Sequence, residues 1–159
     1  MKNIAIIGCG YTSQLSHIPS FINVKNCKII ALVEKRINLG KHVCKKYKIK
    51  NCYLDYKEMY KKHKKNLDAV IIIVRREETY EIAKFFLSKN INVFSEKPMA
   101  KKSEEALKLV EIARKKKLIY QIGYNKLFYS GMSLAKKLLT EKKLGKIIYF
   151  RYVNVCGTG

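Results

Sequence analysis

The sequence predicts a doubly wound α/β fold, in which helices cover both faces of a parallel sheet. Three observations predict it: apolar strand-like runs alternate with helix-like stretches, the first run enters a glycine turn, and an acidic residue closes the second run. The predicted strands are 3–7, 28–34, 52–54, 69–74, 92–95 and 118–122. The predicted helices are 13–24, 39–47, 56–64, 78–88 and 103–116, with a kink expected at Pro19 in the first of them.

The first strand and the turn after it predict a nucleotide site. The strand runs into Gly8-Cys9-Gly10-Tyr11-Thr12-Ser13, where Gly8 allows a tight turn and Gly10 lets a phosphate approach the backbone. Backbone N–H groups at the start of the following helix favour a pyrophosphate. Ser13 occupies the third small position of the turn, and its hydroxyl is a candidate donor to a phosphate. We therefore expect Gly8, Gly10, Tyr11, Thr12 and Ser13 to contact a dinucleotide.

An acidic residue at the end of the second strand supports this prediction. Glu34 follows the turn by about 20 residues, where a carboxylate can accept hydrogen bonds from the adenosine ribose hydroxyls. A carboxylate repels a 2′-phosphate, so Glu34 favours NAD, but Lys35 and Arg36 offer a place for the extra phosphate of NADP. The alternative is a glycine turn of an ordinary α/β fold that binds no ligand.

The formal net charge of +22 raises nucleic acid as a partner. The basic residues, however, lie on several separate helical segments, which is typical of solvated helix faces, at 45–50, 57–65, 114–117 and 136–143. We therefore expect no nucleic-acid partner. A positive field that attracts an anionic cofactor or substrate is the expected consequence of this charge.

Length, apolar content and cysteine spacing predict a cytoplasmic globular protein. The chain of 159 residues is long enough for a core, and its 48% hydrophobic content argues against disorder. Its longest apolar run, 69–74, is too short to span a bilayer, and the first residues do not resemble a signal peptide. The five cysteines lack the spacing of a metal site, so we expect reduced thiols and no bound metal.

A second cluster, Ser95-Glu96-Lys97-Pro98, follows the fifth predicted strand. Ligands of doubly wound sheets bind at the carboxyl ends of the strands, so this cluster is expected beside the cofactor. A lysine there can donate a hydrogen bond to a substrate hydroxyl and stabilise the alkoxide as hydride leaves. Lys97 is therefore the candidate catalytic residue.

Four segments together resemble the N-terminal part of the Gfo/Idh/MocA oxidoreductase family, and they lie at 6–10, 31–34, 93–100 and 122–128. The resemblance implies a Rossmann domain and a nicotinamide-dependent oxidoreductase acting on a sugar, cyclitol or nucleotide-sugar hydroxyl. It implies that Lys97 contacts nicotinamide and substrate, and that Glu96 and Asn125 shape the site. Val74 and Arg75 replace the family's usual turn after the fourth strand, where backbone contacts with the cofactor are still expected.

The resemblance also predicts the domain organisation. Residues 1–122 are expected to form the cofactor domain, and residues 123–159 the start of an incomplete second α/β domain. We expect 146–155 to be a strand apolar on both faces, which would pair with a second copy or with a complementing chain.

The family's catalytic Asp and His are expected beyond residue 159. His17, His42 and His63 do not stand in their positions and are interpreted as structural. The sequence thus predicts a chain that binds cofactor but lacks its proton acceptor. The alternative is a non-catalytic nucleotide-binding or assembly module.

Overall fold

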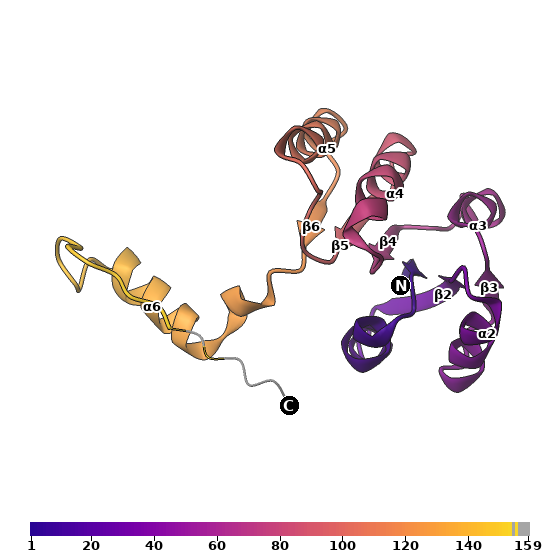
Figure 1. Cartoon of the computed structure of the whole chain (residues 1–159), viewed down its shortest axis with the longest axis horizontal. Coiled ribbons are helices and arrows are strands. Elements are labelled where there is room, and N and C mark those ends of the chain that lie inside the picture. Colours follow the sequence, from indigo (N-terminus) through magenta and orange to yellow (C-terminus); the bar gives the residue numbers. More distant parts are fainter. Residues whose placement is uncertain (154, 156–159) are drawn as a thin grey trace. The chain divides into compact units, whose positions relative to one another are not determined.

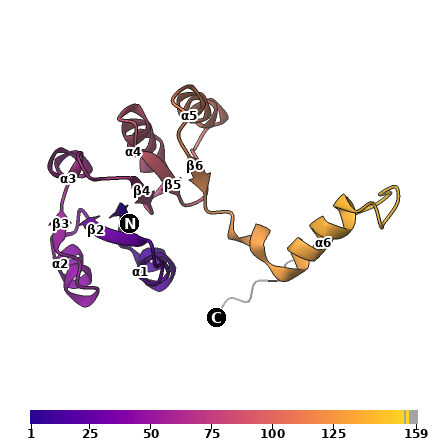
Figure 2. The ribbon, with the colours of Figure 1, turned by 180° about the vertical axis from the view of Figure 1, so that it is seen from behind.

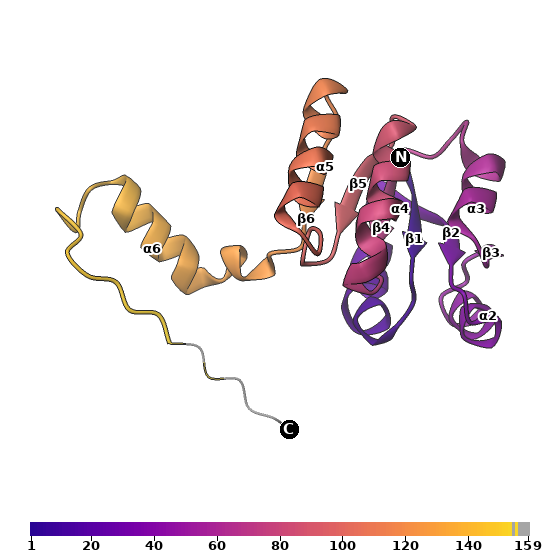
Figure 3. The ribbon, with the colours of Figure 1, turned by 45° about the horizontal axis from the view of Figure 1, so that its top comes forward.

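A computed structural model describes residues 1–153 and 155, and within them one parallel sheet has the strand order β3-β2-β1-β4-β5-β6 (Figures 1 and 3). The strands are β1 (Lys2–Ile7), β2 (Cys27–Val33), β3 (Asn51–Tyr53), β4 (Ala69–Ile72), β5 (Asn92–Ser95) and β6 (Tyr120–Ile122). The order reverses between β1 and β4, which is the topological switch of doubly wound sheets. The predicted fold class is therefore confirmed.

Helices cover both faces of this sheet (Figures 1 and 2). One face packs under α3 (Tyr56–His63), α4 (Arg76–Ser88) and α5 (Ser103–Lys115), and the other under η1 (Ser13–His17), α1 (Ile18–Ile22) and α2 (Ile37–Lys46). Alternate residues of β1 face opposite cores, because side chains of a strand point to alternate sides. Ala5 and Ile7 join the α4 side, which Phe86 and Leu87 fill, whereas Ile4 and Ile6 join the α1 side.

The first predicted helix is built from two pieces. A π-helical turn, η1, is closed by the N–H of Ile18, which donates to the carbonyl of Ser13, and α1 continues from it with Pro19 in its first turn. Proline has no N–H to donate, so the helical hydrogen bonding changes where a donor is missing. The irregularity expected at Pro19 is thus present as a π-helical turn before it.

The chain divides into two compact units, of which the first is Met1–Gly123 and the second begins at Tyr124. The described part of the second unit holds η2 (Asn125–Phe128) and α6 (Ser130–Thr140). The predicted helices do not include α6, although the lysines of 136–143 indicate a helical segment. None of the helices in the described ranges 1–153 and 155 is both long and apolar enough to cross a membrane.

The strand expected over 146–155 is not present. Residues 146–153 and 155 carry no regular secondary structure, and Ile148 is 94% exposed, while Asn154 lies outside the described residues. A β-strand exists only when a neighbouring strand accepts its hydrogen bonds, and the described part of the second unit contains no other strand. The prediction was therefore wrong for the described residues, because an apolar sequence alone does not make a strand.

Candidate functional site

The glycine turn after β1 is shaped by a close contact with Ile73, the residue that follows β4. Gly8 has a φ of +90°, and a Cβ there would lie 2.1 Å from the carbonyl oxygen of Ile73, so only glycine fits. Gly10 differs, because a Cβ at this position would meet nothing within 4 Å. Gly8 is thus required by the fold, whereas Gly10 leaves open space beside the turn, as expected for a backbone that a phosphate approaches.

The rest of the turn divides between surface and interior. Tyr11 is 80% exposed and Thr12 is also exposed, so both are accessible to a ligand. Ser13 is fully buried, and its Oγ has no hydrogen-bond partner among the described residues. This hydroxyl therefore faces the protein interior, and the phosphate contact expected of it remains a prediction.

Glu34 lies beside this turn and is 7% exposed. Its Oε2 accepts from the backbone N–H of Cys9 at 3.1 Å and from the Cys9 thiol at 3.3 Å. Its Oε1 accepts from the backbone N–H of Arg36 at 3.1 Å and from Nε of that side chain at 2.9 Å. The acid predicted to bind the ribose is therefore at the turn, but both of its oxygens already accept hydrogen bonds.

Burial opposes ionisation of Glu34, but the hydrogen bonds from Arg36 and Cys9 outweigh it and lower the pKa of the carboxyl to about 2. Burial, together with the hydrogen bond to Glu34 and its charge, raises the pKa of the Cys9 thiol to about 12. The pair is thus a carboxylate and a neutral thiol at neutral pH. Lys35, the other predicted cation, instead pairs with Glu78 of α4 at 2.6 Å.

Val74 and Arg75 lie between β4 and α4. Val74 is partly buried, and its Cγ1 lies 3.1 Å from the position of a Cβ on Gly8, so this residue borders the glycine turn. Arg75 is exposed and precedes the first residue of α4. The structure therefore brings Val74 to the glycine turn and leaves Arg75 at the surface.

The second cluster follows β5 at the same sheet edge. The backbone N–H of Glu96 donates to the carbonyl of Ile72 at 2.9 Å, and that of Gly123 donates to Ser95 at 2.9 Å, so pairing continues past the strand ends. The Lys97–Pro98 peptide bond is cis. The side chain of Lys97 is exposed, and among the described residues it forms no ion pair.

A histidine interpreted as structural meets this cluster. Nε2 of His17 lies 2.7 Å from Oε1 of Glu96, although the two residues are 79 positions apart. The sequence analysis missed this contact, although His17 lies one helical turn beyond the glycine turn. His63 bonds the hydroxyl of Tyr53 at 2.9 Å, and His42 is exposed on α2.

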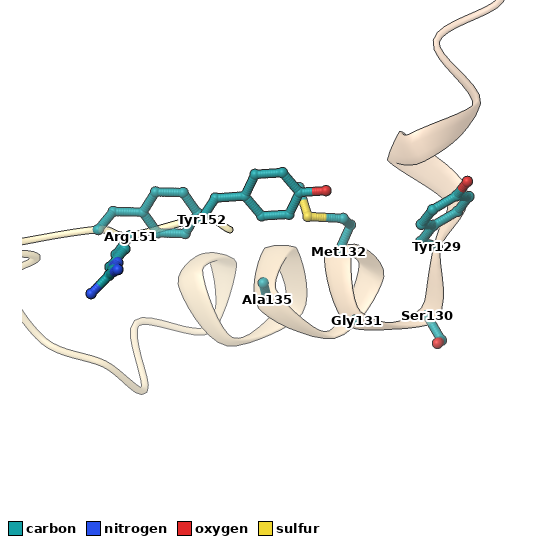
Figure 4. A pocket seen from close by; sticks show the side chains of 8 residues that line it. Tyr129, Ser130, Gly131, Met132, Ala135, Arg151 and Tyr152 are labelled. Atoms are coloured by element: carbon teal, nitrogen blue, oxygen red, sulfur yellow. The ribbon is translucent and has the colours of Figure 1, made fainter. Parts of the chain in front are cut away.

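Asn125 belongs to the second unit, where it is the first residue of η2 and is exposed. Its predicted role in the site remains a prediction. The second unit also has a pocket of about 620 Å³ between α6 and residues 150–152, lined by Tyr129, Ser130, Gly131, Met132, Ala135, Phe150, Arg151 and Tyr152 (Figure 4). This lining includes neither carboxylate nor imidazole, and its polar side chains are Ser130, Arg151 and the phenols of Tyr129 and Tyr152.

Comparison with known proteins identifies the family. Residues 2–124 match the Gfo/Idh/MocA model, described as the oxidoreductase family with an NAD-binding Rossmann fold. The chain belongs to this family. A curated relative, inositol 2-dehydrogenase of Salmonella typhimurium, is 25% identical over 154 residues, covering 94% of this chain and 45% of the relative. An oxidoreductase of Escherichia coli, YhhX, is 27% identical over 146 residues, covering 92% and 42%.

Solved structures agree with this assignment. Myo-inositol 2-dehydrogenase from Lactobacillus plantarum has a TM-score of 0.84 at 25% identity, covering 93% of this chain and 43% of that protein. Scyllo-inositol dehydrogenase from Lactobacillus casei, solved with NAD(H) and scyllo-inositol, shares the fold with a TM-score of 0.83 at 21% identity, covering 91% and 42%. The chain thus spans less than half the length of these Gfo/Idh/MocA proteins.

The residues of the chain fit the cofactor that the Gfo/Idh/MocA family binds. The open space at Gly10 leaves room for a phosphate group beside the backbone, and an ionised Glu34 follows the end of β2. Lys97 and Glu96 follow β5 at the same edge. Among the described side chains, no group of three His, Cys, Asp or Glu residues is arranged to hold a metal ion.

Proposed function

We propose that the chain is the cofactor-binding part of an NAD(P)-dependent oxidoreductase that acts on a hydroxyl of a sugar, cyclitol or nucleotide sugar. The observation that carries this proposal is the meeting of the two motifs: the helix after the glycine turn contacts Glu96 through His17 at 2.7 Å. The substrate class rests on the inositol dehydrogenases among the relatives. Bound nicotinamide would supply the hydride acceptor or donor.

Lys97 carries the catalytic role in this proposal. An exposed ammonium at the carboxyl edge of the sheet can donate a hydrogen bond to the substrate oxygen and stabilise the developing alkoxide. Glu96 accepts a hydrogen bond from the backbone N–H of Lys97 at 3.0 Å, which fixes the turn that bears the lysine. Asn125 is proposed to shape the substrate side of the site.

We propose NAD as the preferred cofactor. Glu34 is ionised near the turn, and its charge opposes a 2′-phosphate. Arg36 is the group positioned to accept that phosphate, because its guanidinium already lies against the carboxylate and is 66% exposed. The four thiols within the described residues, Cys9, Cys27, Cys44 and Cys52, are free, which supports a cytoplasmic location.

A non-catalytic nucleotide-binding module is the second candidate, and the positions of the possible proton acceptors favour it. Asp55 accepts from the first N–H groups of α3, and Asp68 pairs with Lys2 at 2.8 Å. His17 contacts Glu96, and His63 contacts Tyr53. We therefore propose that turnover requires a proton acceptor from outside residues 1–159, and that cofactor binding does not.

Calorimetric titration of the full chain with NAD(H) and NADP(H) tests this proposal. The variant Gly10→Val places a side chain in the open space beside the turn, where a Cβ meets nothing within 4 Å, so it should bind cofactor at least about tenfold more weakly. Gly131→Val is the matched control, because a Cβ at Gly131 also meets nothing within 4 Å. Failure of folded wild-type chain to bind either cofactor would overturn both candidates; turnover by the chain alone would exclude the second.

A further inference from the structure

We propose that His17 is a positioning residue that couples the nucleotide turn to Lys97 through the Glu96 carboxylate. The inference rests on the proposed function, since it assigns a role within the same site. Its basis is the short contact between Nε2 of His17 and Oε1 of Glu96, whose side chains are only 14% and 22% exposed. A contact shielded in this way from water has more effect on geometry than one at the surface.

Glu96 joins two partners through its two oxygens. While Oε1 meets His17, Oε2 accepts the backbone N–H of Lys97 at 3.0 Å. An ionised carboxylate only accepts hydrogen bonds, so Nε2 of His17 carries the hydrogen in this contact. The carboxylate thus connects the imidazole to the main chain of Lys97.

The space around this carboxylate is narrow. A Cβ at Gly123 would lie 3.3 Å from Oε1 of Glu96 and 3.2 Å from the ring of Phe94, so the glycine after β6 leaves just enough room. The imidazole of His17 also meets the Phe94 ring edge to face, with centroids 5.6 Å apart. Packing therefore restricts both partners of the hydrogen bond to a small range of orientations.

The position of His17 in the chain makes it a link. The glycine turn leads directly into η1, whose last residue is His17. Contacts that order the turn around a pyrophosphate should therefore also order His17, which donates the hydrogen bond to Glu96. Loss of the bond should loosen the nicotinamide end of the site and leave the adenosine end, around Glu34, unchanged.

Two substitutions separate hydrogen bonding from packing. His17→Phe keeps a ring against Phe94 but removes the donor, whereas His17→Gln keeps a side-chain N–H. Titration of the full chain with NADH and with ADP-ribose, which lacks nicotinamide, compares the nicotinamide end of the site with the adenosine end. Because the Glu96 carboxylate holds the main chain of Lys97 and not its amine, the expected loss comes from a displaced backbone at the nicotinamide end. We expect His17→Phe to weaken NADH about tenfold with ADP-ribose nearly unchanged, and His17→Gln to restore most of the loss.

The chemical shift of the Lys97 amide proton reports on its hydrogen bond to Glu96 and can be measured without a cofactor. The amide proton of Lys97 should move upfield in ¹H–¹⁵N spectra of His17→Phe, because Glu96 is no longer held as its acceptor, and should return in His17→Gln. If His17→Phe fails to fold, Glu96→Leu removes the same bond from its other side and is expected to weaken NADH selectively in the same way.

Equal weakening of NADH and ADP-ribose in folded His17→Phe would overturn the proposal, since it would indicate a general structural role. An unchanged Lys97 amide, or no rescue by His17→Gln, would also overturn it. Absence of NADH binding by the wild-type chain would instead refute the proposed function. The chemical shift of the Lys97 amide in His17→Phe would then be the measurement that tests whether His17 positions Lys97.

Discussion

The guanidinium of Arg36 and the carboxylate of Glu34 form a two-pronged ion pair, with Nε 2.9 Å from Oε1 and Nη2 3.2 Å from Oε2. The backbone N–H of Arg36 and the backbone N–H and thiol of Cys9 also donate to this carboxylate. The ribose hydroxyls of a bound cofactor must therefore share or replace these hydrogen bonds. Arg36 thus occupies the acid on which the proposed NAD preference depends.

Replacing Arg36 should alter cofactor choice. Without its positive charge, the carboxylate of Glu34 is free for ribose hydroxyls and repels a 2′-phosphate more strongly. In Arg36→Ala the ratio of NADPH affinity to NADH affinity should fall about tenfold, measured by calorimetry. Arg114→Ala is the control, since it removes the same charge from an exposed position on α5. An equal change in both variants would mean that only the overall field matters.

Acid should weaken the fold through Glu34. Its pKa is about 2 in the folded protein and 4.5 as the ordinary value, so its ionised form stabilises the fold above pH 4.5. That contribution is lost as pH falls from 4.5 toward 2. Urea unfolding at several pH values should show that the free-energy deficit of Glu34→Gln relative to wild type shrinks over this range. A deficit independent of pH would contradict the assignment.

Alanine substitution should destabilise the protein strongly at Gly8 and have little effect at Gly10. Gly8→Ala places a Cβ against the carbonyl of Ile73 in a left-handed backbone conformation, and we expect a loss of about 3 kcal/mol or more. Gly10→Ala should change the free energy of unfolding by less than about 1 kcal/mol. Denaturant titration of both variants checks the contrast, which a comparable loss in Gly10→Ala would disprove.

Lys97→Ala should separate binding from catalysis. The exposed amine of Lys97 forms no ion pair among the described residues, so its removal should leave the Kd for NADH within about twofold. Oxidation of inositol by NAD can be followed by the absorbance of the NADH formed, in the presence of whatever supplies the proton acceptor from outside residues 1–159. The turnover rate in this assay should fall by about 10²–10⁴. Lys101→Ala should preserve both. A large loss of NADH binding in Lys97→Ala would show that the lysine is structural.

Most of the first unit could be predicted because its signals are local. Each buried strand is a short apolar run between turns, and β5 occupies the predicted residues 92–95. Helix α6 was not among the predicted helices, although Leu134 and Leu138 have helical spacing and the lysines of 136–143 indicate a solvated helical face. The error at 146–155 has another cause, since strand formation depends on a partner that a sequence pattern does not identify.

The sequence predicts which residues belong to the candidate site better than it predicts the hydrogen bonds between them. Glycine spacing and the acid at residue 34 are features of the sequence, and the structure brings the acid beside the glycine turn, where Glu34 accepts from Cys9. The bonds that Arg36 and Cys9 make to Glu34 depend on side-chain orientations that spacing does not encode. The same holds for His17 and Glu96, because their contact requires β1 and β5 to be two strands apart in the sheet.

The central position of β1 bears on how the chain folds during synthesis. One side of β1 pairs with β2 from Cys27 onward, but its other side pairs with residues 69–72 of β4. Until the ribosome has released those residues, the nascent chain presents an apolar strand edge that nothing covers. The glycine turn, which packs against the carbonyl of Ile73, therefore forms only after the ribosome has released residue 73, and until then this edge is open to chaperones that bind apolar strands.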